Sequence, residues 1–139
     1  MAKAEQPLPD LDRPETRLFW EACQRGELTI QRCGDCGADI WYPQTVCEKC
    51  NSWNVHWRTL SGRGVVYSWI VVRHGLHPYF AGKLPFAVAL VELDDAPTVR
   101  MTTNILDCPV EDIHIGMPVE VVFQKVNEKL TMPYFRRAE

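Results

Sequence analysis

Two cysteine pairs near the start of the chain constrain its fold more than any other feature. The pairs are Cys33-Gly-Asp-Cys36 and Cys47-Glu-Lys-Cys50, with ten residues between them. Two thiolates three positions apart on a tight turn converge on one ion at about 2.3 Å, so two such pairs can surround Zn²⁺ tetrahedrally. Gly37 and Asn51 follow the pairs, and these residue types best tolerate the left-handed backbone that turns a chain back toward a metal. The spacing therefore predicts a zinc ribbon.

Three other interpretations of the four cysteines stay open. A disulfide framework needs an oxidising compartment, yet the sequence opens with Met1-Ala-Lys-Ala-Glu-Gln-Pro7 and lacks the apolar core of an export signal. A thioredoxin-type redox site normally has one C-x-x-C at a strand-to-helix junction, whereas this chain has two in turn-rich sequence. An iron centre is the third alternative. Four thiolates leave no position for water, so we expect the metal to hold structure and not to do chemistry.

The composition restricts the class of protein. The 139 residues suit one ordinary domain or two very small ones, and an apolar content of 46% can fill a modest core. A formal net charge of −3 argues against a nucleic-acid partner, which a basic surface would favour. No apolar run approaches the roughly 20 residues of a membrane span. Because the cysteines are expected to be reduced, we predict a cytoplasmic protein without membrane contact.

The chain divides into four parts. Residues 1–11 hold two prolines among polar residues and are expected to form a flexible lead-in. Residues 12–26 are predicted to form a helix, because Asp12-Arg-Pro-Glu15 has the pattern of a capping box and Gly26 is a stop signal. Residues 27–60 carry the zinc ribbon, whose small core makes it depend on the metal. Residues 61–139 have an all-β pattern.

Five runs in the last part are rich in β-branched and aromatic residues and are separated by glycine, proline or acidic residues. They are residues 65–72, 86–93, 98–103, 119–126 and 130–135. Five short strands in roughly 75 residues fit a barrel of the OB type. One connection between these strands, Arg73 to Pro85, is unusually long. Long loops on a rigid barrel tend to carry function, although a solvated surface loop is the alternative.

Six segments in a fixed order resemble a known family. They are GELTIQRCGDCG, VCEKCNS, LSGRGVVYSWIVV, LPFAVALVELDD, IGMPVEVVF and MPYFRR. From Asp12 to Arg137 the chain closely resembles the zinc-ribbon plus OB-fold proteins catalogued as domain of unknown function 35. The resemblance implies a mainly β fold, with an N-terminal helix, a rubredoxin-like zinc ribbon and a five-stranded OB-fold barrel. Asp95-Ala-Pro97 departs from the family pattern of an acidic residue followed by glycine, which affects only a hairpin turn.

The resemblance also implies a role. Many members are partner subunits of thiolase-like enzymes that make or break carbon–carbon bonds in acyl-CoA thioesters, including aldolases of steroid side-chain breakdown. The sequence fits a non-catalytic subunit, since it lacks a G-x-S-x-G elbow, a phosphate-binding glycine loop and an H-E-x-x-H motif. We therefore expect a thiolase-like catalytic partner, two copies of each chain in the complex, and acyl-CoA at the shared interface.

Candidate contact residues come from the long loop and the helix. Basic side chains could attract the phosphates of coenzyme A, and aromatic ones could line a channel. The candidates for acyl-CoA or partner contact are Arg63, Arg73, His74, His77, Tyr79, Phe80 and Lys83. Phe19 and Trp20 on the predicted helix are the candidates for partner docking. The alternative function is a stand-alone OB module for single-stranded nucleic acid, with Tyr67 and Trp69 on one strand face stacking bases.

Overall fold

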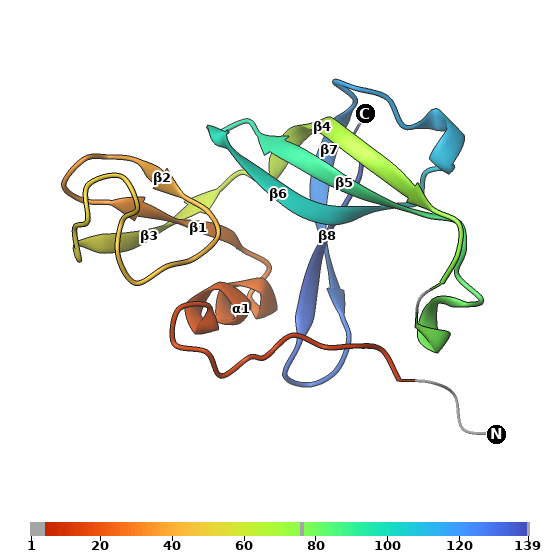
Figure 1. The fold of residues 1–139 in the computed structure, drawn as a ribbon, viewed down its shortest axis with the longest axis horizontal. Helices are drawn as coiled ribbons and strands as arrows, with labels where there is room; N and C mark the ends of the chain where they lie inside the picture. Colours follow the sequence, from red (N-terminus) through yellow and green to blue (C-terminus); the bar gives the residue numbers. More distant parts are fainter. Residues whose placement is uncertain (1–4, 76, 139) are drawn as a thin grey trace.

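The computed structural model describes residues 5–75 and 77–138, and Figure 1 shows an N-terminal helix beside a small sheet and a barrel. The predicted lead-in is thus described only from residue 5 onward. The elements are α1 (Arg17–Gln24), β1 (Leu28–Cys33), β2 (Asp39–Ile40), β3 (Val55–Leu60), β4 (Arg63–Val72), the short 3₁₀ helix η1 (Pro78–Phe80), β5 (Phe86–Leu93), β6 (Ala96–Leu106), the 3₁₀ helix η2 (Val110–Asp112), β7 (Pro118–Lys125) and β8 (Thr131–Arg137). In this part of the chain no helix is long and apolar enough to cross a membrane.

The helix starts later than the sequence predicts. Its N-cap is Thr16, not Asp12, and the Thr16 hydroxyl makes no capping hydrogen bond. The N–H of Asp12 bonds its neighbour Asp10, and residues 13–16 form a turn closed by the N–H groups of Thr16 and Arg17 on the Arg13 carbonyl. The predicted end is confirmed. Gly26, at φ +76°, lets the N–H groups of Gly26 and Glu27 reach the carbonyls of Cys23 and Ala22.

The first sheet is the zinc ribbon. Its strand order is β2-β1-β3, with both pairings antiparallel. β1 pairs with β3 along its whole length, from Leu28 opposite Leu60 to Cys33 opposite Val55. This pairing brings the first cysteine pair next to the strand that leaves the second.

The second sheet closes into a barrel with the order β4-β5-β6-β8-β7. The pairings are antiparallel except for a short parallel one between β6 and β8. These strands confirm the five predicted ones and the mainly β, OB-type fold. β6 is longer than predicted at both ends. It begins at Ala96 directly after a two-residue turn and includes Pro97, and it continues past Thr103 to Leu106.

One continuous core joins helix, ribbon and barrel. Phe19 and Cys23 of α1 pack in the same buried cluster as Ile30 of β1 and Phe135 of β8. Phe19 is only 4% exposed, and its ring meets those of Trp20 and Trp41 edge to face at 5.0 Å. The apolar face of the helix, with Phe19 on it, therefore covers this chain's own core.

A polar junction fixes the ribbon against the barrel. Arg58 of β3 makes two hydrogen bonds of 3.0 Å to the Asp39 carboxylate and one of 2.8 Å to the Asp95 carbonyl. The Asp95 carboxylate in turn accepts bonds from the backbone N–H and the hydroxyl of Ser61. The acidic residue of this turn, which fits the family pattern, therefore links the barrel to the ribbon.

Candidate metal centre and ligand groove

The four predicted sulfurs meet at one point. All of them lie within 4.8 Å of one another. Two of the pairs join the two knuckles, with 3.5 Å between the sulfurs of Cys33 and Cys50 and 3.7 Å between those of Cys36 and Cys47. A tetrahedron with Zn–S bonds of about 2.3 Å has edges of about 3.8 Å. The separations fit one tetrahedral ion better than disulfides, whose sulfurs stand at about 2.05 Å.

Each knuckle has the turn that the metal requires. Gly37 and Asn51 adopt φ angles of +74° and +62°, as the sequence predicts. Their N–H groups return to the carbonyls of Cys33 and Cys47 at 3.0 and 2.8 Å. The N–H of Cys36 also points at the Cys33 sulfur, 3.4 Å away, and it is the largest of several hydrogen bonds that together lower the pKa of Cys33 to about 6. A thiol that ionises so readily suits a metal ligand.

A second layer of hydrogen bonds ties the knuckles together. The Asp35 carboxylate, inside the first knuckle, accepts bonds from the Ser52 hydroxyl and from the side-chain amide of Asn54. These two bonds, with Ser52 the stronger cause, hold the pKa of Asp35 below its usual range. Because Ser52 and Asn54 follow the second knuckle, the contacts hold the two knuckles at a fixed separation.

A groove opens away from the ribbon, between the barrel and the long loop that connects β4 to β5. Its volume is about 510 Å³. Its walls come from η1 and the loop after it, the start of β5, the ends of β6 and β7, and the middle of β8. The lining residues are Gln6, Tyr79, Phe80, Lys83, Phe86, Asn104, Ile105, Leu106, Asp107, Gln124, Lys125, Val126 and Tyr134.

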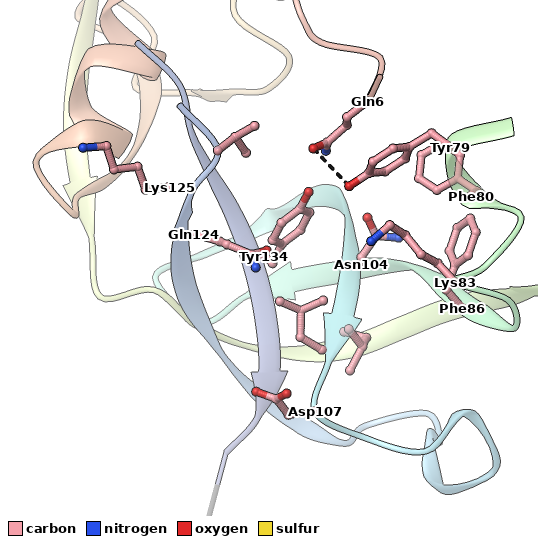
Figure 2. A pocket seen from close by; sticks show the side chains of 13 residues that line it. Gln6, Tyr79, Phe80, Lys83, Phe86, Asn104, Asp107, Gln124, Lys125 and Tyr134 are labelled. Carbon is pink, nitrogen blue, oxygen red and sulfur yellow. Dashed lines mark hydrogen bonds between the residues drawn. The ribbon is translucent and has the colours of Figure 1, made fainter. Parts of the chain in front are cut away.

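Polar groups converge over an aromatic wall in this groove. Figure 2 shows Tyr79, Tyr134, Asn104 and Lys83 directed into the same space, with Asp107 apart from them at the far end. The Tyr79 hydroxyl donates to Gln6 at 3.3 Å, and the Lys83 ammonium lies 4.8 Å from the centre of the Tyr79 ring. A site of this kind suits a partly apolar ligand with a polar or anionic end.

The structure brings together some of the predicted contact residues and separates others. Tyr79, Phe80 and Lys83 line the groove. His77 does not line it; its Nδ1 accepts the Tyr79 N–H at 3.1 Å and so caps η1. Arg73 and His74 are exposed in the same loop without lining the groove. Arg63 stands at the opposite end of β4, about 30 Å along the strand, and pairs with Glu120 at 3.9 Å.

Sequence reasoning missed the barrel side of the groove. Asn104 lies on β6 and donates from its side chain to the Ala87 carbonyl at 2.9 Å, which holds its side-chain amide in place. Tyr134 lies on β8, and Phe86 at the start of β5 packs on Phe80 with 5.3 Å between ring centres. One feature of the sequence could have indicated this side of the groove: Asn104 directly follows a predicted strand, and asparagine is uncommon in strands.

The remaining thiols and histidines form no catalytic pair in the described residues. Burial raises the pKa of Cys23 to about 12, so this thiol is inert. The Cys108 thiol donates to the Pro109 carbonyl, and a ring nitrogen of His114 bonds the backbone of Asp112. Tyr67, a candidate for base stacking, has the Arg100 guanidinium 3.8 Å above its ring, which occupies one face.

Two family profiles cover most of this sequence. Residues 20–54 match the family described as ChsH2, rubredoxin-like zinc ribbon domain, and residues 57–124 match ChsH2, C-terminal OB-fold domain. A protein of Methanocaldococcus jannaschii named DUF35 domain-containing scaffold protein is 37% identical over 118 residues, which cover 84% of this chain and 82% of that protein. The chain belongs to the DUF35 family. The resemblance inferred from the six sequence segments is confirmed.

Some DUF35 relatives are longer proteins. A Thermomonospora curvata protein named probable enoyl-CoA hydratase alpha subunit is 39% identical over 138 residues, or 98% of this chain and 41% of that protein. A Mycobacterium tuberculosis protein named 3-oxo-4,17-pregnadiene-20-carboxyl-CoA hydratase alpha subunit is 34% identical over 110 residues, or 78% of this chain and 33% of that protein. The chain spans less than half the length of either relative.

Solved structures share the DUF35 fold. A chain of the Ltp2-ChsH2(DUF35) aldolase superposes with a TM-score of 0.83 and 34% identity, covering 94% of this chain and 100% of that one. A DUF35 protein of Sulfolobus solfataricus with unknown function superposes with a TM-score of 0.61 at 12% identity, covering 90% and 86% of the two chains. The second match supports the fold alone.

Proposed function

We propose that this chain is a non-catalytic subunit of a complex in which a thiolase-like enzyme makes or breaks a carbon–carbon bond in an acyl-CoA thioester. The observation that carries the proposal is the match, at 34% identity and full coverage of its DUF35 chain, to the Ltp2-ChsH2 aldolase. We expect the complex to work in the cytoplasm on lipid, aromatic or steroid substrates, and to leave nucleophile and general base to the partner.

The four cysteines would hold Zn²⁺ as a structural ion. Sulfur separations of 3.5 and 3.7 Å fit its tetrahedron, and four thiolates exclude a reactive water. The ion would keep the ribbon rigid, so that the ribbon and the barrel present a single surface to the partner.

The groove would form one wall of the acyl-CoA site. Tyr79 and Phe80 supply apolar surface, Asn104 and Tyr134 supply hydrogen-bonding groups, and Lys83 supplies positive charge for an anionic end of the ligand. Arg73, His74 and His77 in the same loop remain proposed contacts of ligand or partner. Arg63 lies too far from this loop to share the groove, so we assign it only to partner contact.

The helix would dock the partner through its exposed side. Trp20 is partly buried and packs on the core, and it also lines a shallow hollow with Leu11, Arg17 and Lys129. Phe19 supports this surface from beneath. Because thiolase-like enzymes are typically dimers, a complex of two copies of each chain is the simplest closed arrangement.

Co-expression with a thiolase-fold protein of the same organism tests the proposal. We expect a stable complex by size-exclusion chromatography with light scattering, zinc near one ion per copy of this chain, and thioester turnover only when both chains are present. Trp20→Lys should weaken the complex while preserving the circular dichroism spectrum. Turnover of acyl-CoA by this chain alone would contradict the non-catalytic role.

A second candidate is a subunit of an enoyl-CoA hydratase. The names of the longer relatives from Thermomonospora and Mycobacterium favour it. Product analysis separates the two functions: hydration adds water to a double bond and keeps the carbon skeleton, whereas the thiolase-like reaction changes the number of carbons in the acyl group. A complex that only hydrates enoyl-CoA would decide for the second candidate.

A further inference from the structure

One strand of the barrel is paired along only part of its second edge. β4 pairs with β5 from Gly64 to Val72. Its other edge pairs with β7 only from Arg63 to Val65, and two further backbone bonds join Val66 to Gly116 and Met117. Figure 1 likewise shows β7 beside β4 only near one end. Within residues 5–75 and 77–138, no backbone group is bonded to this edge from residue 67 to residue 72.

A β-bulge explains where the pairing stops. The register between β4 and β5 shifts between Val66 and Ser68, which leaves Tyr67 without a partner in β5. An extra residue of this kind bends a strand and increases its twist. β4 therefore leaves β7 after Val66, and in the described part of the chain the second edge of residues 67–72 is unpaired. We call these six residues the open edge.

Two residues of the open edge have exposed apolar side chains, and a third such residue lies near its start. Ile70 is 63% exposed and Tyr67 is 44% exposed. Ile115, 71% exposed, lies next to the start of the edge because the N–H of its neighbour Gly116 donates to the Val66 carbonyl. Unpaired backbone groups beside such a strip mark a surface for strand addition.

The open edge also lacks the features that usually protect an edge strand. Its sequence, YSWIVV, contains no charge, proline or glycine, although proteins blunt such edges with lysine, proline or a covering loop. Arg73 follows the edge in sequence, and Arg100 lies over the Tyr67 ring. An edge left uncovered and uncharged in this way is suited to an uncharged, extended segment.

We infer that the open edge is a docking site for an extended, uncharged segment of the catalytic partner, which adds as a strand beside β4. The inference rests on the proposed function. Such a segment would run toward the groove, since Phe86, a groove residue, is the β5 partner of Val72 at the end of the edge. The partner would thereby complete the barrel and border the ligand site with one segment.

A second copy of this chain fits the open edge less well. A strand pair of six residues is about 20 Å long, and it buries well below the roughly 800 Å² per partner of a stable interface. A copy held by this edge alone would dissociate. A segment of a protein that already docks through other surfaces needs no such area.

Hydrogen–deuterium exchange tests the inference in the complex with the co-expressed thiolase-fold protein. The alternate amides of residues 67–72 that face away from β5 should exchange at least about tenfold more slowly in the complex than in the free chain. The amides that face β5 are protected in both states and serve as an internal control. A complex that forms without added protection at residues 67–72 overturns this inference and leaves the proposed function standing.

Two substitutions at one position sharpen the test. Ile70→Lys places an edge-protecting charge on the strip and should weaken the complex about tenfold, whereas Ile70→Thr keeps the β propensity without charge and should change affinity less than threefold. Equal effects of the two would overturn the inference. Failure to form any complex would overturn the proposed function and this inference with it. If the free chain self-associates and Ile70→Lys abolishes that self-association, the edge binds a second copy instead and the inference is overturned.

Discussion

The ribbon and the barrel are held together by different means. The buried cluster that belongs to the ribbon alone contains Ile40 with Cys33 and Cys47, two of the proposed metal ligands, and Ala38 and Val55 pack against it. The barrel has a much larger core of aliphatic and aromatic side chains, in which Phe135 is fully buried. The contrast indicates that metal binding takes the place of a hydrophobic core in the ribbon, while the barrel depends on packing.

Removing the metal should give the largest effect. Structural zinc contributes on the order of 10 kcal/mol to the folding of small domains. We expect Cys47→Ser, or a strong chelator, to unfold the ribbon, with lost zinc by elemental analysis and rapid proteolysis within residues 33–57. The matched control is Cys108→Ser, whose thiol lies outside the sulfur cluster and should leave the zinc content unchanged. A ribbon that stays folded without metal would contradict the claim that metal binding replaces a hydrophobic core there.

Truncating the barrel core should rank second. Phe135 is completely buried, and Phe→Ala in a core costs about 3–5 kcal/mol. We expect Phe135→Ala to lower the urea midpoint of unfolding, followed by tryptophan fluorescence, while the protein still binds zinc. Phe80→Ala is the control, because Phe80 lines the groove and is only partly buried. Equal losses from the two variants would contradict a core centred on Phe135.

Cutting the junction should have a smaller effect. Arg58→Ala removes two bonds to Asp39 and one to the Asp95 carbonyl, and the loss of a hydrogen-bonded, partly buried ion pair should cost about 1–3 kcal/mol of unfolding free energy. Arg58→Lys should recover only part of this, since an ammonium cannot make the paired contact of a guanidinium. Thermal unfolding of the three proteins measures the difference, and full rescue by lysine would argue against the fork geometry.

The smallest effect on stability is expected at Trp53. This side chain is 75% exposed on the ribbon, and surface substitutions of this kind usually change stability by less than about 0.5 kcal/mol. We expect Trp53→Ala to leave the unfolding midpoint and the zinc content unchanged. A loss of affinity for the partner with unchanged stability would assign Trp53 to the docking surface.

Local patterns predicted the ribbon and the strands well. The knuckles depend on short-range geometry, and the left-handed Gly37 and Asn51 are visible in sequence because few residue types adopt that conformation. The helix start was missed: Asp12 instead donates its N–H to Asp10, and a separate turn at residues 13–16 precedes the helix. A capping pattern identifies a possible start, and the tertiary contacts select the one that is used.

The groove was predicted on one side only. Tyr79, Phe80 and Lys83 share a conspicuous loop, whereas Asn104 and Tyr134 come from two strands far away in sequence. Their proximity follows from the parallel pairing of β6 with β8, which local patterns do not specify. The packing of Phe19 could not be specified for the same reason, because an amphipathic helix shows that it has an apolar face but not which surface that face covers.

The packing of α1 has a consequence for how the chain is made. Gln24 at the end of the helix bonds the Glu128 carbonyl, 104 residues further along, and Phe19 shares its cluster with Phe135. During synthesis the apolar side of the helix therefore emerges long before the last strand that completes its binding surface. Contacts between segments far apart in sequence form late and slow folding. Until β8 has been synthesised, the apolar side of α1 lacks its binding surface and favours aggregation.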